Sequence, residues 1–420
     1  MTAGRHGDDS TTADVVVIGG GINGAAAAFH LATRGAGRVV LLDVPSPRSA
    51  TPKSGAMLTL HHPSLPQASL AHAGLRELAR VPELTGLPTG FTRSGIVHLL
   101  PPRYANTMRD AVAAQQAAGI PVRELPLPEL AALFPGADLD DVGAAVVEPD
   151  SGYADPVLTT RAYLEGARRA GADVRHTAVR RVLTGGGRVK GVETEAGDTV
   201  SAPAVVLAAG VWSARLLEPL GIDLGLGARR VQITRFRVEP GSLPDGAPVL
   251  LDQVRGSWIR PDTPTSLLAG LEMGVPVEGP ADGPEGVDQW YVDMCRAKLA
   301  GRFAGLSSAA MRGGWAGLIA MSPHGRPVID ELAEATGLFC AVADSGSSFK
   351  TAPVVGKCLA EWIVDGAPRS ANLTPFGRSR PAGPGPSDDG YGRFGSAAKL
   401  AREIHQLRRA PSRTQEGRST

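Results

Sequence analysis

Three glycines at residues 19, 21 and 24, in the segment IGGGINGA, follow the spacing GxGxxG. In such a motif Gly19 permits a tight turn, Gly21 lets a pyrophosphate approach the backbone, and Gly24 lets a helix pack closely on a strand. Asp43 follows about 20 residues later, where a carboxylate accepts a hydrogen bond from a ribose hydroxyl. The combination predicts a dinucleotide-binding site, with a merely structural turn as the alternative.

The elements around these glycines have the order that such a site requires. Residues 14–18 (DVVVI) predict a strand buried on both faces, and residues 23–33 predict an alanine-rich helix. Residues 38–42 (RVVLL) predict the second strand of a βαβ unit. Ile22 and Asn23 lie at the helix start, so its N–H groups and the positive end of its dipole face the phosphates.

The composition is that of an ordinary globular protein, and 420 residues suit two domains. Hydrophobic residues make up 43% and charged residues 20%, and no apolar run approaches the roughly 20 residues needed for a membrane span. The polar start MTAGRHGDDSTTA predicts a cytoplasmic location. A net charge of +1 gives no electrostatic case for nucleic acid as a partner.

The three cysteines, Cys295, Cys340 and Cys358, are widely spaced and form no CxxC or Cys/His cluster. We therefore expect neither a disulfide framework nor a metal site, and we expect buried, inert thiols.

Five segments resemble the D-amino-acid-oxidase-type flavoproteins, the superfamily of glycine oxidase and of sarcosine oxidases and dehydrogenases. The first is VVVIGGGINGAAAAFHLATRG, and the most specific is GSSFKTAPVVGKCLAEWIVDG at residues 346–366. The other three, in the superfamily's order, are residues 150–174, 205–213 and 313–330. The resemblance implies that the dinucleotide is FAD.

The resemblance also implies further FAD contacts. The backbone of Val179 is expected to meet the adenine. The remaining expected contacts are Ser54, Gly55, Ala209, Gly210, Trp212, Gly346, Ser347, Ser348, Phe349 and Lys350.

A small-residue loop, Gly346 to Ser348, opens the final helix. Its backbone donors are expected to meet the pyrimidine edge of the flavin and to stabilise the negative charge of the reduced ring. Lys350 would then be the cation nearest the ring and a candidate anchor for a substrate carboxylate, with a solvated lysine as the alternative.

Three more residues are candidates for the substrate side. His61 and His62 follow the flavin-side loop and are expected to line the active site. Trp258, in SWIRP, lies where the superfamily often carries an aromatic residue over the substrate, although core packing is an equal alternative. His98, in the apolar run IVHLL, is expected to be a buried strand histidine with satisfied hydrogen bonds.

Departures from the superfamily pattern bear on cofactor attachment and on the substrate. No cysteine is found near Gly317 and no histidine in residues 50–57, the places of covalent flavin linkage, so FAD is expected to be noncovalent. Ile319 stands where glycine oxidase has a carboxylate-binding arginine, and residues 54–60 (SGAMLTL) lack a second such arginine. Lys350 remains the only well-placed anchor.

The fold class expected is α/β with an α+β second domain. A Rossmann-type FAD-binding domain would comprise residues 14–90, 150–225 and 312–368. An interleaved substrate domain, residues 91–149 and 226–311, would be built on a large mixed sheet. Residues 369–420, rich in Pro, Gly, Ser and Arg, predict a disordered tail.

The expected function is oxidation of a carbon–nitrogen bond in a small amine or amino acid to an imine, by hydride transfer to the flavin. The electron acceptor is left open between O2 and a protein or quinone. Alternatives are FAD-dependent oxidation of a 2-hydroxy acid or other alcohol, a nicotinamide dehydrogenase, and an FAD-binding subunit that needs a partner chain for activity.

Overall fold

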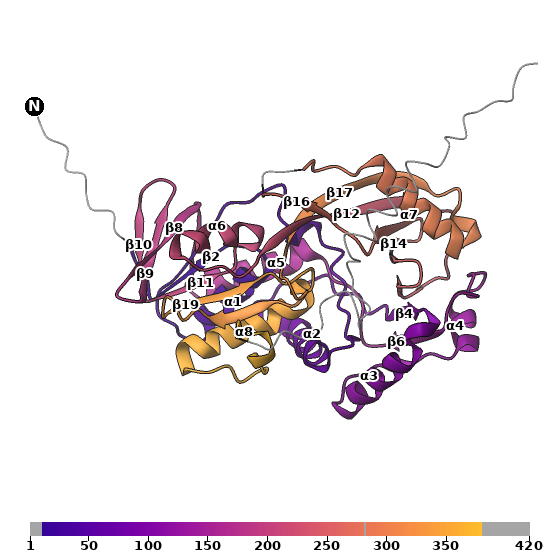
Figure 1. Cartoon of the computed structure of the whole chain (residues 1–420), viewed down its shortest axis with the longest axis horizontal. Helices are drawn as coiled ribbons and strands as arrows, with labels where there is room; N and C mark the ends of the chain where they lie inside the picture. The colour runs from indigo at the N-terminus through magenta and orange to yellow at the C-terminus, as the bar shows by residue number, and fades with distance from the viewer. Residues whose placement is uncertain (1–10, 281–282, 380–420) are drawn as a thin grey trace, which may run out of the picture.

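The computed structural model describes residues 11–280 and 283–379, and two large sheets dominate this part of the chain (Figure 1). The first is six-stranded, in the order β18-β19-β11-β2-β3-β7, and is parallel except for β18. Its strands are β2 (Val15–Ile18), β3 (Val39–Asp43), β7 (Asp173–His176), β11 (Ala204–Leu207), β18 (Val328–Glu331) and β19 (Leu338–Val342).

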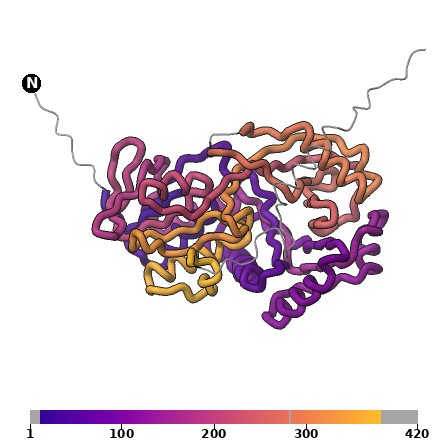
Figure 2. Tube along the Cα trace, viewed as in Figure 1, coloured from indigo at the N-terminus to yellow at the C-terminus, as the bar shows by residue number. Residues whose placement is uncertain are grey.

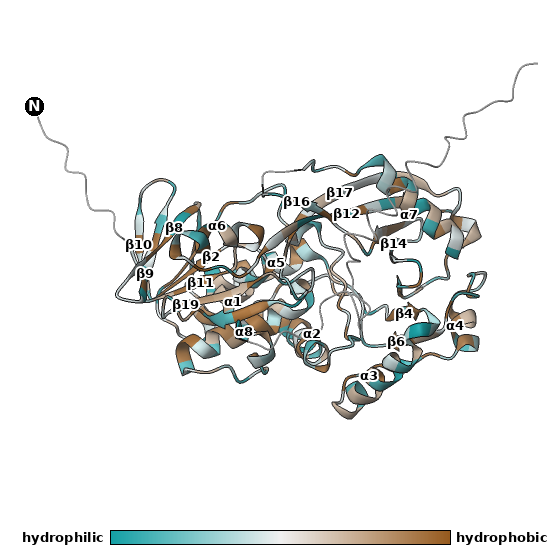
Figure 3. Cartoon of the chain, viewed as in Figure 1, coloured by the Kyte–Doolittle hydropathy of each residue, from teal (hydrophilic) through white to brown (hydrophobic). Residues whose placement is uncertain are grey.

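Helices cover one face of this sheet and a small sheet covers the other. The helices are α1 (Ile22–Thr33), α2 (Leu65–Thr85), α5 (Pro156–Arg169) and α8 (Ser348–Asp365). The opposite face packs against α6 (Ser213–Leu217) and a four-stranded sheet of β1 (Thr11–Thr12), β8 (Val179–Gly185), β9 (Arg188–Thr194) and β10 (Thr199–Ser201). Figure 3 shows mainly hydrophobic residues along α8 and the central strands, as expected for strands buried on both faces.

The second sheet is nine-stranded and joins segments that are distant in sequence. Its strands are β4 (Ile96–Leu100), β5 (Arg123–Glu124), β6 (Ala144–Glu148), β12 (Gly227–Arg237), β13 (Val249–Asp252), β14 (Ser257–Thr263), β15 (Ser266–Leu271), β16 (Val275–Val277) and β17 (Ala310–Met321). β4 pairs in parallel with β13, so the purple and orange parts of the trace meet in one sheet (Figure 2). α4 (Leu127–Leu133) and α7 (Gln289–Arg302) contribute to its core, and α3 (Ala105–Ala117) packs beside α2.

The α/β fold class, with its large mixed sheet, is confirmed. One boundary of the predicted division differs from the structure. The sequence predicts that residues 312–321 belong to the FAD-binding part, but β17 pairs with β12 along its length and belongs to the nine-stranded sheet.

Among residues 11–280 and 283–379, no helix combines the length and the apolar character that a bilayer span requires.

The predicted disordered tail begins too early. Leu373 and Phe376 are only 3% and 1% exposed, and Thr374–Phe376 forms a 3-10 helix. The backbone N–H of Arg378 donates to Asp330 Oδ2 at 2.7 Å. Two apolar anchors hold residues 369–379 on the FAD-side core, although the average composition of residues 369–420 is that of a disordered tail. Residues 380–420 lie outside the described residues.

Two of the helices on the six-stranded sheet, α1 and α8, come into backbone contact at Gly356. A Cβ at this position would lie 2.6 Å from Ala26 C and from Ala27 N, so only glycine allows the two backbones to approach this closely. Both helices begin at the same end of the sheet, and the Gly356 contact fixes their relative position.

Gly356→Ala should therefore lower the free energy of unfolding by about 1–3 kcal/mol, because the new methyl group must push two backbones apart. Gly305→Ala is the matched control, since a Cβ there meets nothing within 4 Å. Urea denaturation followed by circular dichroism measures both variants. Equal midpoints for the two would contradict this account of the α1–α8 contact.

Candidate active site

A cavity of about 450 Å³ lies between the two sheets, a size typical of small-molecule sites. Its floor is formed by the carboxyl ends of the parallel strands, including Ile18, Asp43 and Ala208. Its opposite wall comes from the nine-stranded sheet, including Ile233 and Trp258. Open parallel sheets place ligands at this edge.

The glycine motif has the close contacts predicted for it. Gly19 has φ of 101°, and a Cβ there would lie 2.5 Å from Ala208 O. A Cβ on Gly24 would lie 1.8 Å from Gly19 O. Gly21 caps α1 and lines the cavity, whereas Gly24 serves the packing of α1 on β2 and is not part of the lining. Gly19 and Gly21 therefore present only backbone to the cavity at the start of α1.

Asp43 is held at the end of β3 with its carboxylate at the cavity. Its Oδ1 accepts a hydrogen bond from Gly20 N at 2.8 Å. A Cβ on Gly20 would lie 2.8 Å from Asp43 Cγ, so this residue must also be small. The aspartate thus lies where a ribose hydroxyl is expected.

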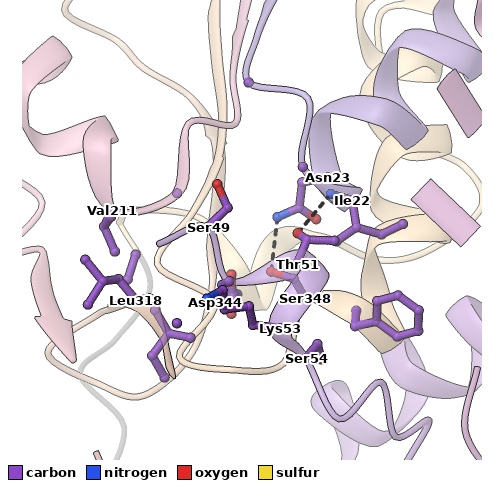
Figure 4. Close-up of a pocket in the computed structure, with 18 of the residues that line it drawn as sticks. Ile22, Asn23, Ser49, Thr51, Lys53, Ser54, Val211, Leu318, Asp344 and Ser348 are labelled. Atoms are coloured by element: carbon purple, nitrogen blue, oxygen red, sulfur yellow. Dashed lines mark hydrogen bonds between the residues drawn. The ribbon is translucent and has the colours of Figure 1, made fainter. Parts of the chain in front are cut away.

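Side chains from a loop and from α8 meet the start of α1 (Figure 4). Ile22 N donates to Thr51 Oγ1 at 3.2 Å, and Asn23 Nδ2 donates to Ser348 Oγ at 3.2 Å. The second bond connects the first turns of α1 and α8. Two helix N-termini, which favour negative charge, therefore lie together at the cavity.

Backbone strain is concentrated at the same place. Within the described residues, the non-glycine residues with positive φ are Ala56 (50°), Ala343 (54°) and Ser345 (53°). Ala56 lines the cavity, and the other two flank Asp344, which also lines it. Asp344 Oδ1 accepts from Gly346 N at 2.7 Å, which closes the turn before α8. Such conformations cost of order 1–3 kcal/mol each and cluster at ligand sites.

Trp258 forms part of the apolar wall and is also packed in the core. It is 8% exposed and belongs to a cluster with Ile233 and Leu251. A Cβ on Gly270 would lie 2.4 Å from the indole, so the ring lies flat on a strand position that admits no side chain. The two alternatives for Trp258 are therefore compatible.

Lys350 lies in the first turn of α8 and lines the cavity, yet it is only 7% exposed. Its ammonium donates to Thr59 Oγ1 at 2.5 Å. Lys350 is thus not a solvated surface lysine: the residue lines the cavity, and its ammonium is held by Thr59, which does not.

His61 and His62 do not line the cavity, which corrects the expectation for both. His61 is 3% exposed, and its Nδ1 lies 2.9 Å from Gln115 Oε1 on α3. Burial, followed by the charge of His98, lowers the pKa of His61 to about 4. Gln115 Nε2 donates to the His62 carbonyl oxygen at 2.5 Å. These contacts hold the segment on the α3 side, away from the cavity.

The other expected cofactor residues lie in the cavity lining. They are Gly19, Gly21, Ile22, Asn23, Asp43, Ser54, Gly55, Val179, Ala209, Gly210, Trp212, Gly346, Ser347, Ser348, Phe349 and Lys350.

Several lining residues were not found from the sequence: Thr51, Lys53, Arg215, Glu272 and Asp344. Thr51 and Lys53 belong to a short 3-10 helix, Thr51–Lys53, in a Pro- and Ser-rich segment whose sequence carries no periodicity. Only the Gly and Ser residues around Asp344 gave a signal.

The lining contains neither cysteine nor histidine among the described residues. The thiols of Cys295, Cys340 and Cys358 are buried elsewhere, and burial raises the pKa of each to about 12. Within residues 11–280 and 283–379, no group of three or more His, Cys, Asp or Glu side chains is arranged to hold a metal ion.

The fold and the cavity together define a dinucleotide-binding protein with a second sheet over its cofactor site. The chain belongs to the FAD-dependent oxidoreductase family, whose model matches residues 14–362. It is therefore a flavoprotein and an FAD-dependent oxidoreductase, and the close-packed glycines, Asp43 and the two helix N-termini fit FAD.

Relatives of known activity match most of this chain. The 4-methylaminobutanoate oxidase (formaldehyde-forming) of Paenarthrobacter nicotinovorans is 29% identical over 88% of this chain and 46% of its own length. Glycine oxidase of Bacillus licheniformis is 26% identical over 84% of this chain and 93% of its own length. The chain spans less than half of the former relative and 40% of the mouse sarcosine dehydrogenase that it also matches.

Solved structures share the fold. L-proline dehydrogenase from P. horikoshii has a TM-score of 0.78 at 22% identity, covering 88% of this chain and 97% of that one. Glycine oxidase from Geobacillus kaustophilus has a TM-score of 0.75 at 24% identity, covering 89% and 100%.

Gly270→Ala tests how the apolar wall is built. The added methyl group should displace the Trp258 indole toward the cavity, because the ring now lies 2.4 Å from the Cβ position. We expect a changed near-ultraviolet circular dichroism spectrum and at least a tenfold higher KM for a reducing substrate. Gly227→Ala, on β12 with no atom within 4 Å of its Cβ, is the control. A wild-type KM in Gly270→Ala would show that Trp258 does not shape the substrate end.

Proposed function

We propose that this protein oxidises a carbon–nitrogen bond of a small amine or amino acid to an imine, with noncovalently bound FAD as the oxidant. The observation that carries the proposal is that a buried lysine, Lys350, and an apolar wall around Trp258 line the same cavity. The activities named for the relatives, oxidation of a methylamino acid and of glycine, support the same class of substrate.

The chain's own residues would hold FAD along the cavity. The backbone at Gly21 and Ile22 would face the pyrophosphate, and Asp43 the ribose. The turn before α8 would lie at the flavin edge; the N–H groups of Gly346 and Ser347 donate to Asp344 within the turn, so they shape it and are not the flavin's donors that the sequence predicts. When bound, FAD supplies the acceptor for the hydride equivalent that leaves the carbon beside the substrate nitrogen.

The protein's part in the reaction is binding, orientation and exclusion of water. Lys350 would hold a substrate carboxylate, which fixes one end of the molecule. Trp258, Leu251 and Met57 would cover the apolar part and keep water from the reacting bond. The nitrogen lone pair forms the C=N bond as the hydride leaves, and water then hydrolyses the imine to a carbonyl compound and an amine.

Absorbance spectroscopy of the purified protein tests this proposal. We expect flavin bands, release of the flavin into the supernatant on acid precipitation, and bleaching during anaerobic titration with an amino acid or secondary amine. Reoxidation by air, compared with reoxidation by a quinone or dye, then identifies the electron acceptor. Bleaching by 2-hydroxy acids alone would replace the proposal with alcohol oxidation, and no bleaching without a second chain would indicate a partner-dependent subunit.

Lys350→Met tests the anchor. Loss of one charge-assisted hydrogen bond, worth roughly 1.5–3 kcal/mol, should raise KM for a carboxylate-bearing amine about 10- to 100-fold. The change should be much smaller for an amine without a carboxylate. Steady-state kinetics with a matched pair, an N-methyl amino acid and the corresponding N-methyl alkylamine, provides the comparison. An equal rise for both substrates would remove Lys350 from carboxylate binding.

A further inference from the structure

A buried carboxylate, Glu148, lies behind the cavity and is surrounded by hydrogen-bond donors. Its side chain is fully buried at the end of β6. Oε1 accepts from His98 Nε2 at 2.6 Å and from His61 N at 2.7 Å. Oε2 accepts from Leu60 N at 2.7 Å and from Ser151 Oγ at 2.5 Å. Four donors on two oxygens fill the acceptor capacity of a carboxylate, which has about four lone-pair sites.

The carboxylate is charged at neutral pH. Burial by itself would raise the pKa of Glu148, but the charge of His98 and the hydrogen bonds from His98, Ser151 and Leu60 lower it to about 2. His98 lies on β4, the strand next to β6, and is 2% exposed. His98 is therefore a buried strand histidine, as expected, but its hydrogen bonds are satisfied only in part: Nε2 donates to Glu148, and Nδ1 has no hydrogen-bond partner among the described residues.

Two of the four bonds hold the backbone of the segment that carries Thr59. Leu60 and His61 donate their N–H groups to Glu148, and the residue before them, Thr59, contacts the Lys350 ammonium at 2.5 Å. Thr59 is 1% exposed, so its side chain has little room to change conformation. The position of its hydroxyl therefore follows the position of the segment. A chain of direct contacts thus runs from β6 of the nine-stranded sheet to Lys350 in the first turn of α8.

His61 supports the same arrangement from the side. Its ring lies edge-on to His98, with 5.2 Å between ring centroids, and its Nδ1 contacts Gln115. His61 and His62, which the sequence predicts to line the active site, therefore have structural roles behind it. His61 packs behind the segment, and His62 accepts from Gln115 through its carbonyl oxygen.

We propose that Glu148, paired with His98, is a positioning residue that sets the location of the Lys350 ammonium through the segment Thr59 to His61. The inference rests on the proposed function only in assigning Lys350 to a substrate carboxylate. Glutamine cannot replace Glu148, because one amide oxygen cannot accept from both backbone N–H groups and from His98, and the amide NH2 would face other donors.

The same chain offers a matched control in Glu361. This carboxylate, 3% exposed, also accepts from two backbone N–H groups, those of Arg369 at 2.6 Å and Ser370 at 2.8 Å, and from Ser370 Oγ at 2.6 Å. It lies near the opposite end of α8 from Lys350 and does not line the cavity. Glu361→Gln therefore damages a comparable buried network without touching the segment at residues 59–61.

The experiment titrates FAD-loaded wild type, Glu148→Gln, Glu361→Gln and Thr59→Val with acetate, a carboxylate without an oxidisable amine. Acetate binding is followed by the flavin difference spectrum and by the rise in melting temperature. We expect acetate affinity to fall at least tenfold in Glu148→Gln and in Thr59→Val and to change less than twofold in Glu361→Gln. Both glutamine variants should lose thermal stability, so stability alone cannot produce this pattern.

Wild-type acetate affinity in folded Glu148→Gln would overturn the inference. If Glu148→Gln does not fold, Thr59→Val decides, because it keeps every bond to Glu148 and removes only the hydroxyl at Lys350; wild-type affinity in that variant would also overturn it. A crystal structure of Glu148→Gln with Lys350 Nζ still within hydrogen-bond distance of Thr59 Oγ1 would overturn it as well.

The proposed function can fail separately. If Lys350→Met binds acetate as tightly as wild type, Lys350 does not hold a carboxylate, and the substrate assignment is wrong. The position of Lys350 in the Glu148→Gln crystal structure then decides the positioning inference by itself, since that readout requires no ligand.

Discussion

The approach of α1 to α8 is the contact on which the cavity depends. The chain positions that meet here are more than three hundred residues apart, and Asn23 donates to Ser348 across the first turns of the two helices. The backbones touch because Gly356 lacks a side chain opposite Ala26 and Ala27. Each helix contributes an N-terminus to the cavity, so the contact brings two partial positive charges to one place. The dinucleotide motif supplies only the first of them.

The substrate side depends on a different set of close contacts. Gly270 leaves room for the Trp258 indole, and Arg260 Nη1 donates to the Gly55 carbonyl oxygen at 3.0 Å, which joins the nine-stranded sheet to a residue of the cavity lining. Deeper in the same sheet, Asp252 accepts two hydrogen bonds from Arg302, and both side chains are almost fully buried. A buried charge that loses its partner is strongly destabilising, so this pair favours the strand arrangement that keeps Asp252 and Arg302 together over other strand registers.

The sequence was sufficient for the parts of the site that depend on local spacing. The glycine motif, Asp43 and the Gly-Ser turn before α8 each combine a turn residue with a neighbouring strand or helix, and local chemistry decides such features. Thr51, Lys53 and Glu272 were missed because their positions follow from how distant segments meet. His61 and His62 show the same limit. Their closeness in sequence to residues 50–57 predicts that they line the active site, but Glu148 on β6 and Gln115 on α3 hold this segment away from the cavity.

The strand order of the six-stranded sheet has a consequence for synthesis of the protein. β19 lies between β18 and β11, and α8 follows it directly along the chain. While a ribosome is still making residues 338–365, α1 has no α8 to cover its alanine-rich face, and the site lacks the wall formed by the turn before α8. Most of the described chain must therefore leave the ribosome before the cofactor can be enclosed. Topologies dominated by such distant pairings fold slowly and expose apolar surface meanwhile.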